Sequence, residues 1–189
     1  MLLSYNRLVE LVEDGVINAD PENINGASID VTLGNVFKFE SPFNHLGNVL
    51  HEPKDLDLEK QSVQFDIVHL DIDGCPKIYL YPGTYCLAET KEVFNLPNNI
   101  AAEYKLKSSM ARNGLNHLLA GWCDPGFHNS TLTLELHNVN QHHAIMLKPG
   151  MKIGQIIFYE VDPVPEEASY KTKGQYNNQK GAQESKGVR

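Results

Sequence analysis

Hydrophobic positions near the start of the chain repeat with the spacing of a helix. Within residues 4–14, three apolar side chains fall on one helical face: Leu8, Leu11 and Val12. Ser4 stands where a helix N-cap is favoured, and Gly15 stands where the helix would end. The pattern therefore predicts one short amphipathic helix.

Beyond that helix the hydrophobic period changes to two, which is the spacing of half-buried strands. Strand patterns cover residues 29–33, 36–39, 78–81, 85–88, 102–107, 131–137 and 153–159, with a weaker one at 63–70. Pro82-Gly83 and Pro149-Gly150 are dipeptides that favour type II turns. Many short strands with one helix predict a mostly β protein, folded as a closed or folded-over β barrel.

Length and composition predict how the chain is organised. At 189 residues and 41% hydrophobic content, we expect one domain at residues 1–165. Residues 166–189 contain few apolar side chains, so composition alone predicts a disordered tail. The formal charge of −8 divides into −10 for the domain and +2 for the tail.

The charge and hydropathy exclude several classes of partner. An acidic domain lacks the broad basic surface that nucleic-acid binding requires, so we expect no nucleic-acid partner. No run of about 18 apolar residues predicts a membrane span, and the start lacks a signal-peptide pattern. We therefore expect no membrane association and a cytoplasmic location.

Residues 107–114 combine donors with the start of a predicted helical turn. Lys107, Ser108 and Ser109 stand beside the unpaired N–H groups of that turn, an arrangement suited to binding an anion. Ser108 and Arg112 are four residues apart and would share one face. The same residues are more often those of a serine-capped surface turn with a solvated arginine, so this pattern alone does not establish an anion site.

Residues 131–137 alternate strictly between leucines and polar side chains. The polar face carries Thr131, Thr133, Glu135 and His137. If that face lines a cleft, Glu135 between threonine hydroxyls can act as a general base. If the face points outward, Glu135 is an ordinary solvated side chain, and the pattern does not decide between these alternatives.

Two further features concern ligands. Asp124 lies in the glycine-containing segment 120–127, where the backbone can approach a ligand closely, although an aspartate before a proline also starts turns. Eight histidines raise the question of zinc, but the chain has neither a C-x-x-C nor an H-E-x-x-H motif. We therefore expect no zinc site.

Taken together and in order, these segments resemble the dCTP deaminases, which are relatives of the trimeric dUTPases. The resemblance rests on the segments at 25–34 (Asn-Gly-Ala-Ser-Ile-Asp-Val-Thr-Leu-Gly), 80–83, 107–115, 120–127, 132–138, 148–155 and 176–181. It implies a homotrimer of dUTPase-like, distorted β-barrel subunits of the β-clip type, with active sites between neighbouring subunits. It also implies Mg²⁺ held mainly by the nucleotide triphosphate.

The resemblance assigns roles to individual residues. Glu135 would activate water for attack on C4 of cytosine, with Ser108 and Arg112 orienting water and base. Asp124 would bind the deoxyribose. Lys107 and Ser109 would bind the phosphates. The backbone of Thr133 and Leu134 would contact the base, with Gln155 nearby. A C-terminal lid at 166–189 would add contacts from Tyr170, Lys173 and Gln179.

The resemblance also implies the reaction. The expected activity is hydrolytic deamination of dCTP to dUTP and ammonia, a cleavage of a cyclic amidine C–N bond that feeds dUMP and dTTP synthesis. Two alternatives stay open: a bifunctional enzyme that continues to dUMP and pyrophosphate, and a catalytically silent nucleotide-binding relative. Whether dTTP inhibits the protein also stays open.

Overall fold

The computed structural model describes residues 1–41, 65–69 and 76–187. Its strands are β1 (Ile29–Thr32), β2 (Val36–Glu40), β3 (Phe65–His69), β4 (Ile78–Leu80), β5 (Tyr85–Asn95), β6 (Ile100–Leu106), β7 (Leu115–His117), β8 (Trp122–Cys123), β9 (His128–Asn138), β10 (Ile145–Leu147) and β11 (Lys152–Glu160). The helices are α1 (Tyr5–Glu13), the 3-10 turn η1 (Pro21–Asn23), α2 (Ser108–Arg112) and α3 (Tyr170–Lys173). The predicted mostly β class is confirmed.

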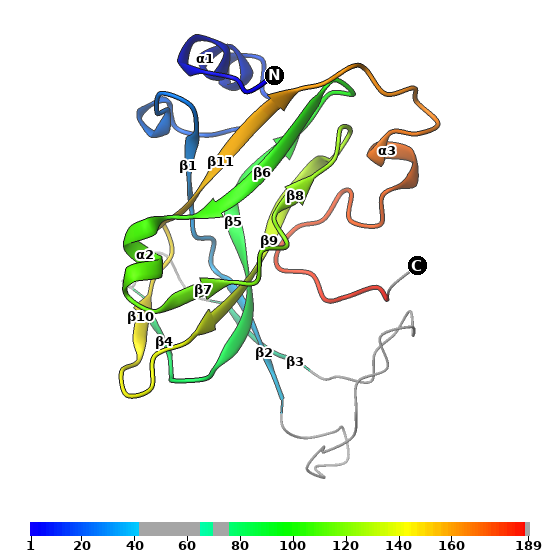
Figure 1. Ribbon diagram of the computed structural model, residues 1–189. Helices are drawn as coiled ribbons and strands as arrows, with labels where there is room; N and C mark the ends of the chain where they lie inside the picture. Colours follow the sequence, from blue (N-terminus) through cyan, green and yellow to red (C-terminus); the bar gives the residue numbers. More distant parts are fainter. Residues whose placement is uncertain (42–64, 70–75, 188–189) are drawn as a thin grey trace.

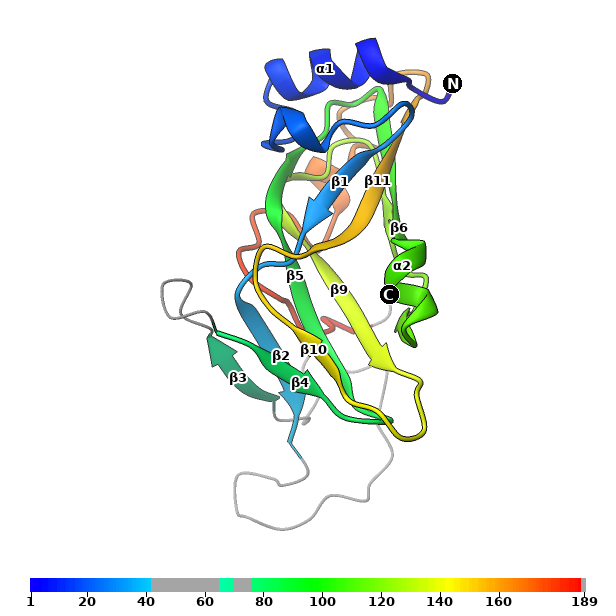
Figure 2. The same cartoon turned by 90° about the vertical axis from the view of Figure 1, so that its left-hand side faces the viewer.

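The strands form three antiparallel sheets. One has the order β1-β11-β6-β8, the second pairs β10 with β4, and the third has the order β3-β2-β5-β9-β7. Figures 1 and 2 show an elongated molecule in which these sheets wrap around a common interior. The expected barrel is thus folded over rather than closed, because no continuous hydrogen-bonded ring joins the sheets within the described ranges.

The predicted N-terminal helix is α1, which lies across the end of the molecule beside β1 and β11 (Figure 2). Leu8 and Leu11 are buried on its inner face, as the spacing predicts. Ser4 occupies the N-cap position, although its side chain makes no capping hydrogen bond. Amphipathicity, rather than the cap, therefore holds this helix in place.

The alternating side chains of β9 hold this strand in place, because its leucines are buried in the hydrophobic core. Leu134 and Leu136 are fully buried, and each contributes about 1.5–3 kcal/mol of hydrophobic stabilisation. β9 lies between β5 and β7, with Leu87 opposite Glu135 and His117 opposite Leu136. This register directs the polar face of β9 away from the leucine core.

The turns follow the predicted chemistry. Gly83 has φ +75° and Gly150 has φ +80°, which are the left-handed values that the second central residue of a type II turn requires. The predicted weak strand at 63–70 corresponds to β3, although its predicted ends lie outside the described residues. Cys86 and Cys123 are buried free thiols, and burial raises the pKa of each to about 12.

The described part of the tail is ordered against the β sheets, in contrast to the disorder that composition predicts. The backbone N–H of Tyr170 donates to Pro125 (2.9 Å), and that of Thr131 donates to Gln179 (3.2 Å). Figure 1 shows the tail running beside β8 and β9. The Gln and Asn side chains of the tail lower its hydrophobicity, but they also form hydrogen bonds with the neighbouring strand. A count of residue types does not show those hydrogen bonds.

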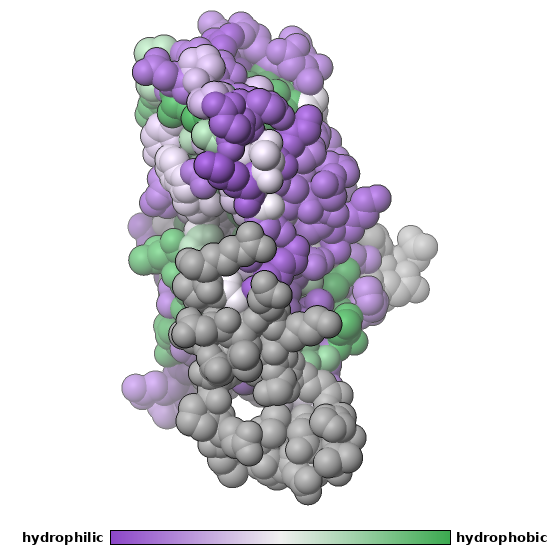
Figure 3. Space-filling model, turned by 90° about the vertical axis from the view of Figure 1, so that its right-hand side faces the viewer, coloured by the Kyte–Doolittle hydropathy of each residue, from purple (hydrophilic) through white to green (hydrophobic). Residues whose placement is uncertain are grey.

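The face that carries α3 and the tail is mostly hydrophilic over its described residues (Figure 3). Among the helices that the structure describes, none is long and apolar enough to cross a membrane.

Candidate active site

A cavity of about 480 Å³ opens between β9, the end of β8 and the tail. Its lining residues are Phe65, Tyr85, Leu87, Ala120, Trp122, Cys123, Asp124, Phe127, Leu132, Thr133, Glu135, Tyr170, Tyr176, Gln179, Gln183, Glu184 and Ser185. Both an apolar wall and converging polar groups are present, as in pockets that bind small molecules. Five of the residues that the sequence singled out meet here: Asp124, Thr133, Glu135, Tyr170 and Gln179.

Glu135 lies on the wall of this cavity, so the polar face of β9 lines a cleft. Its side chain is 23% exposed, whereas the flanking Leu134 and Leu136 are buried in the core. The alternative of a solvated outer face is therefore excluded for the isolated subunit. A carboxylate that is largely withdrawn from water can serve as a general base.

Two buried side chains stand behind Glu135. His117 Nε2 on β7 lies 3.1 Å from Glu135 Oε2, and the Tyr104 ring on β6 packs on the His117 imidazole with a centroid separation of 4.6 Å. Burial, followed by the negative charge of Glu135, raises the pKa of the Tyr104 hydroxyl. The same two causes raise the pKa of Tyr85 to about 12. Both tyrosines are therefore neutral near pH 7.

Asp124 follows β8 at the mouth of the cavity. Its Oδ1 accepts a hydrogen bond of 2.8 Å from the indole Nε1 of Trp122, the one tryptophan of the sequence. The next turn contains Gly126 at φ +92°, where an added Cβ would lie 2.1 Å from Ser169 Oγ. Only glycine therefore lets the tail approach this closely.

The tail is joined to β9 beside the cavity. Gln179 Nε2 donates to the carbonyl oxygen of Thr131 (2.8 Å), and the Gln183 N–H donates to Thr133 Oγ1 (3.0 Å). An ion pair of 2.9 Å between Lys38 and Glu184 adds a contact to β2. Gln179 is buried, and these contacts place the tail over one wall of the cavity.

Several residues that the sequence singled out lie away from the cavity lining. Ser108, Ser109 and Arg112 are exposed on α2. The side chain of Leu134 is in the core, and Lys173 is exposed on α3. The expected substrate contacts are thus divided between the cavity and a separate surface around α2.

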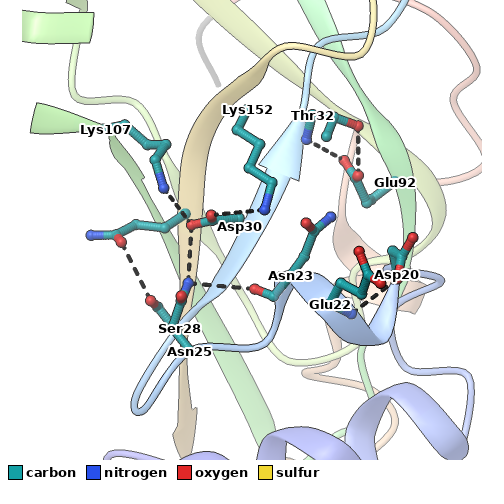
Figure 4. Close-up of polar contacts among 11 residues, drawn as sticks. Asp20, Glu22, Asn23, Asn25, Ser28, Asp30, Thr32, Glu92, Lys107 and Lys152 are labelled. Atoms are coloured by element: carbon teal, nitrogen blue, oxygen red, sulfur yellow. Dashed lines mark hydrogen bonds and ion pairs between the residues drawn. The ribbon is translucent and has the colours of Figure 1, made fainter. Parts of the chain in front are cut away.

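A second polar cluster, centred on Asp30, adjoins α2 (Figure 4). Asp30 Oδ1 accepts from Lys107 Nζ (2.7 Å) and Asn25 Nδ2 (3.0 Å), and Lys152 Nζ lies 3.6 Å from Oδ2. Burial of Asp30 alone would raise its pKa, but hydrogen bonds from Lys107 and Asn25 and the two lysine charges lower it overall. Lys107 is thus fixed by an ion pair at the start of α2.

Gln155 lies on β11 in the same region. Its Oε1 accepts a hydrogen bond of 3.3 Å from Ser28 Oγ, and Asp30 is its partner in the strand register. The Asp30 cluster therefore collects Lys107 and Gln155, two predicted substrate contacts, at a place separate from Glu135.

Metal ligands do not gather in the described ranges: no group of three or more His, Cys, Asp or Glu side chains is arranged to hold an ion. His142 and His143 are exposed between β9 and β10. The absence of zinc stays a prediction.

Sequence reasoning missed three residues of the site: Tyr104, His117 and Trp122. Tyr104 and His117 come from other strands, and only the pairing of β7 with β9 and of β8 with β6 brings them in. Trp122 stands two residues before Asp124, inside the segment 120–127. The alternation of residues 102–107 placed Tyr104 on a buried face, which was the single signal available.

Comparison with known proteins identifies the family of this chain. The family model described as dCTP deaminase-like matches residues 2–161. A relative from Nanoarchaeum equitans named "dCTP deaminase, dUMP-forming" is 38% identical, covering 98% of this chain and 96% of the relative. A relative of the same name from Methanosphaerula palustris is 34% identical, covering 96% and 93%.

Among solved structures, the 2'-deoxycytidine 5'-triphosphate deaminase from Agrobacterium tumefaciens matches with a TM-score of 0.62 and 18% identity. The match covers 89% of this chain and 51% of that chain, so this chain spans about half the length of the solved one. That likeness supports the fold, while the family match and the two relatives extend over nearly the whole sequence. The chain belongs to the dCTP deaminase-like family.

Proposed function

We propose that this protein deaminates dCTP hydrolytically and carries the product on to dUMP. One water replaces the amino group at C4, giving dUTP and ammonia, and a second water cleaves dUTP to dUMP and pyrophosphate. The observation that carries the first step is Glu135, a largely buried carboxylate on the wall of a nucleotide-sized cavity. The dUMP-forming relatives at 34–38% identity favour the second step over a deaminase that stops at dUTP.

Glu135 acts as both base and acid in the first step. As a carboxylate it takes a proton from water, which makes the nucleophile for C4. It then returns a proton to the departing nitrogen, so the group ends the cycle in its starting state. A single carboxylate suffices because the two proton transfers follow one another, and burial keeps bulk water from competing.

The substrate is held from both sides of the cavity. Asp124 takes the deoxyribose hydroxyl with its Oδ2, since Oδ1 already accepts from Trp122. The backbone of Thr133 and Leu134 on β9 contacts the base edge. We propose that Asp124 also orients the water for the second step.

We further propose that each active site is shared between two subunits of a homotrimer. Ser108, Ser109 and Arg112 are exposed and lie outside the cavity lining, although an anionic substrate at Glu135 needs cationic and hydroxyl partners. A neighbouring subunit that presents its α2 surface to this cavity would supply them. Lys107 and Gln155 would then approach the same nucleotide from the neighbour.

Mg²⁺ enters the active site bound to the nucleotide triphosphate. Mg²⁺ prefers oxygen ligands and retains several waters, so a triphosphate can hold it with little help from the protein. It neutralises phosphate charge, which the acidic cavity, with Asp124, Glu135 and Glu184, would otherwise oppose. The chain's own part is to position the nucleotide.

The tail completes the site as a lid. Tyr170 and Gln179 already line the cavity, and Lys173 is exposed nearby on α3, where its charge can reach phosphate. Residues 166–187 would shift over the bound nucleotide and exclude water.

Product analysis tests the function. Purified protein is incubated with dCTP and Mg²⁺, and ammonia, dUTP, dUMP and pyrophosphate are measured. We expect ammonia with dUMP and pyrophosphate in equal amounts. Ammonia with dUTP alone would refute the second step, and binding of dCTP without ammonia would refute deamination and indicate the silent relative.

A further inference from the structure

Five buried side-chain polar atoms have no hydrogen-bond partner among the described residues, and three of them belong to the linked side chains of Tyr104, His117 and Glu135. These three are Tyr104 Oη, His117 Nε2 and Glu135 Oε2. The last two are 3.1 Å apart but are not aligned as a hydrogen bond. An unsatisfied buried polar group costs about 1–3 kcal/mol, so such groups are rare and their clustering calls for an explanation.

Two glycines leave the space that the Tyr104 side chain occupies in this cluster. An added Cβ at Gly154 on β11 would lie 2.1 Å from Tyr104 Cε2 and 2.5 Å from its hydroxyl oxygen. An added Cβ at Gly121 would lie 2.8 Å from Tyr104 Cβ and from its carbonyl oxygen. The ring is 97% buried and fixed against His117, so its hydroxyl has little freedom to find a partner elsewhere.

We propose that Tyr104 is a positioning residue for Glu135, acting through His117. Its ring sets the orientation of the imidazole, and its hydroxyl joins His117 Nε2 and Glu135 Oε2 in binding one buried water. Such a water makes two to four hydrogen bonds, so it would satisfy all three atoms together. The proposal rests on the proposed role of Glu135 and adds the group that holds this carboxylate in place.

The direction of the effect follows from the groups around Glu135. Those with charge or titratable protons are His117 from β7, Tyr104 from β6, Tyr85 from β5, Asp124 after β8, and Tyr170, Tyr176 and Glu184 from the tail. Asp124 and Glu184 carry carboxylates, whereas His117 and Tyr104 can donate hydrogen bonds toward the Glu135 carboxylate or its bound water. Loss of the Tyr104 hydroxyl therefore removes one of the donors that hold this carboxylate in place.

Replacement of Tyr104 by Phe removes the hydroxyl and keeps the ring. For Tyr104→Phe we expect kcat for ammonia release to fall about tenfold, as for one lost hydrogen bond, with KM for dCTP unchanged. The matched control is Tyr159→Phe, which removes a partly exposed hydroxyl bonded to Glu103 and should alter neither of these values.

A second readout does not depend on turnover. The imidazole ¹⁵N resonances of His117, assigned by comparison with His117→Gln, should shift in Tyr104→Phe and stay unchanged in Tyr159→Phe. A thermal melt should show Tyr104→Phe folded and slightly less stable than wild type, since one hydrogen bond to the buried water is removed. In His117→Gln, the added Tyr104→Phe change should no longer lower kcat.

Unchanged His117 resonances in Tyr104→Phe would overturn the proposal, as would shifted resonances with an unaltered kcat. A wild-type protein that releases no ammonia from dCTP fails the proposed function instead. In that case the His117 resonances alone decide whether Tyr104 orients the imidazole.

Discussion

His117 Nε2 lies 3.1 Å from Glu135 Oε2, which joins β7 to β9 behind the cavity. The two residues are 18 positions apart in sequence, and the contact places a polar side chain behind the Glu135 carboxylate. A carboxylate with a cavity on one side and a buried imidazole on the other is suited to repeated proton transfer. The predictions below follow from this arrangement and from the separate surface around α2.

Replacement of Glu135 by Gln should stop deamination. The amide keeps the shape of the side chain but cannot accept a proton from water, so we expect kcat to fall by roughly 10²–10⁴-fold. Binding of dCTP, measured by calorimetry, should persist. The control Glu13→Gln, on the exposed end of α1, should retain normal turnover. Ammonia release by Glu135→Gln at the wild-type rate would remove this residue from the mechanism.

Subunit mixing tests whether sites are shared. Glu135→Gln and Arg112→Ala proteins should each be inactive alone. If each site takes Glu135 from one subunit and Arg112 from its neighbour, equal mixing by joint refolding should restore about a quarter of the wild-type activity in a cyclic trimer. The mixed sample should run as a trimer in analytical ultracentrifugation. Trimers with no recovered activity would place both residues in one subunit's site.

Gln179 should contribute to nucleotide affinity. Replacement by Ala removes its 2.8 Å hydrogen bond to the Thr131 carbonyl and loosens the tail beside the cavity. We expect KM for dCTP to rise on the order of tenfold, comparable to the loss of one hydrogen bond. The adjacent Lys180 is exposed, so Lys180→Ala is the matched control. An equal KM for both variants and wild type would remove the tail contact from binding.

The sequence predicted the local features of this molecule and missed the non-local ones. The alternation around Glu135, the helical turn at Ser108 and the type II turns follow from spacing and from residue conformational preferences. The approach of Tyr104 and His117 to Glu135 depends on which strands pair and in what register. Periodicity within one strand carries no information about that register.

The Asp30 cluster shows the same limit. Asp30 lies opposite Gln155 on β11, and Gln155 lies opposite Lys105 on β6, so two successive pairings are needed before Lys107 can reach Asp30. The motif residues Asp30 and Lys107 were visible in the sequence, but their ion pair was not. The resemblance to a family supplied roles for Lys107 and Arg112 that the residues alone left open.

The Asp30 ion pairs should make stability depend on pH. Because the folded state lowers the pKa of Asp30, its stabilisation is present above the unfolded pKa of about 4 and is lost as pH falls through the lower folded value. Asp30→Asn should therefore reduce the free energy of unfolding by about 1–3 kcal/mol at pH 7. Urea denaturation should show this difference shrinking below pH 4. A difference independent of pH would contradict the ionic origin.

The most direct test of hydrolytic deamination by this protein is to measure whether oxygen from the solvent enters the nucleotide product. Wild-type protein is incubated with dCTP and Mg²⁺ in H₂¹⁸O, and the nucleotide product is analysed by mass spectrometry. We expect dUMP whose uracil carries ¹⁸O at O4, with ammonia released in equal amount. A second ¹⁸O should appear on the dUMP phosphate or on pyrophosphate. A product that retains the amino group of cytosine would contradict the assignment of this cavity to deamination.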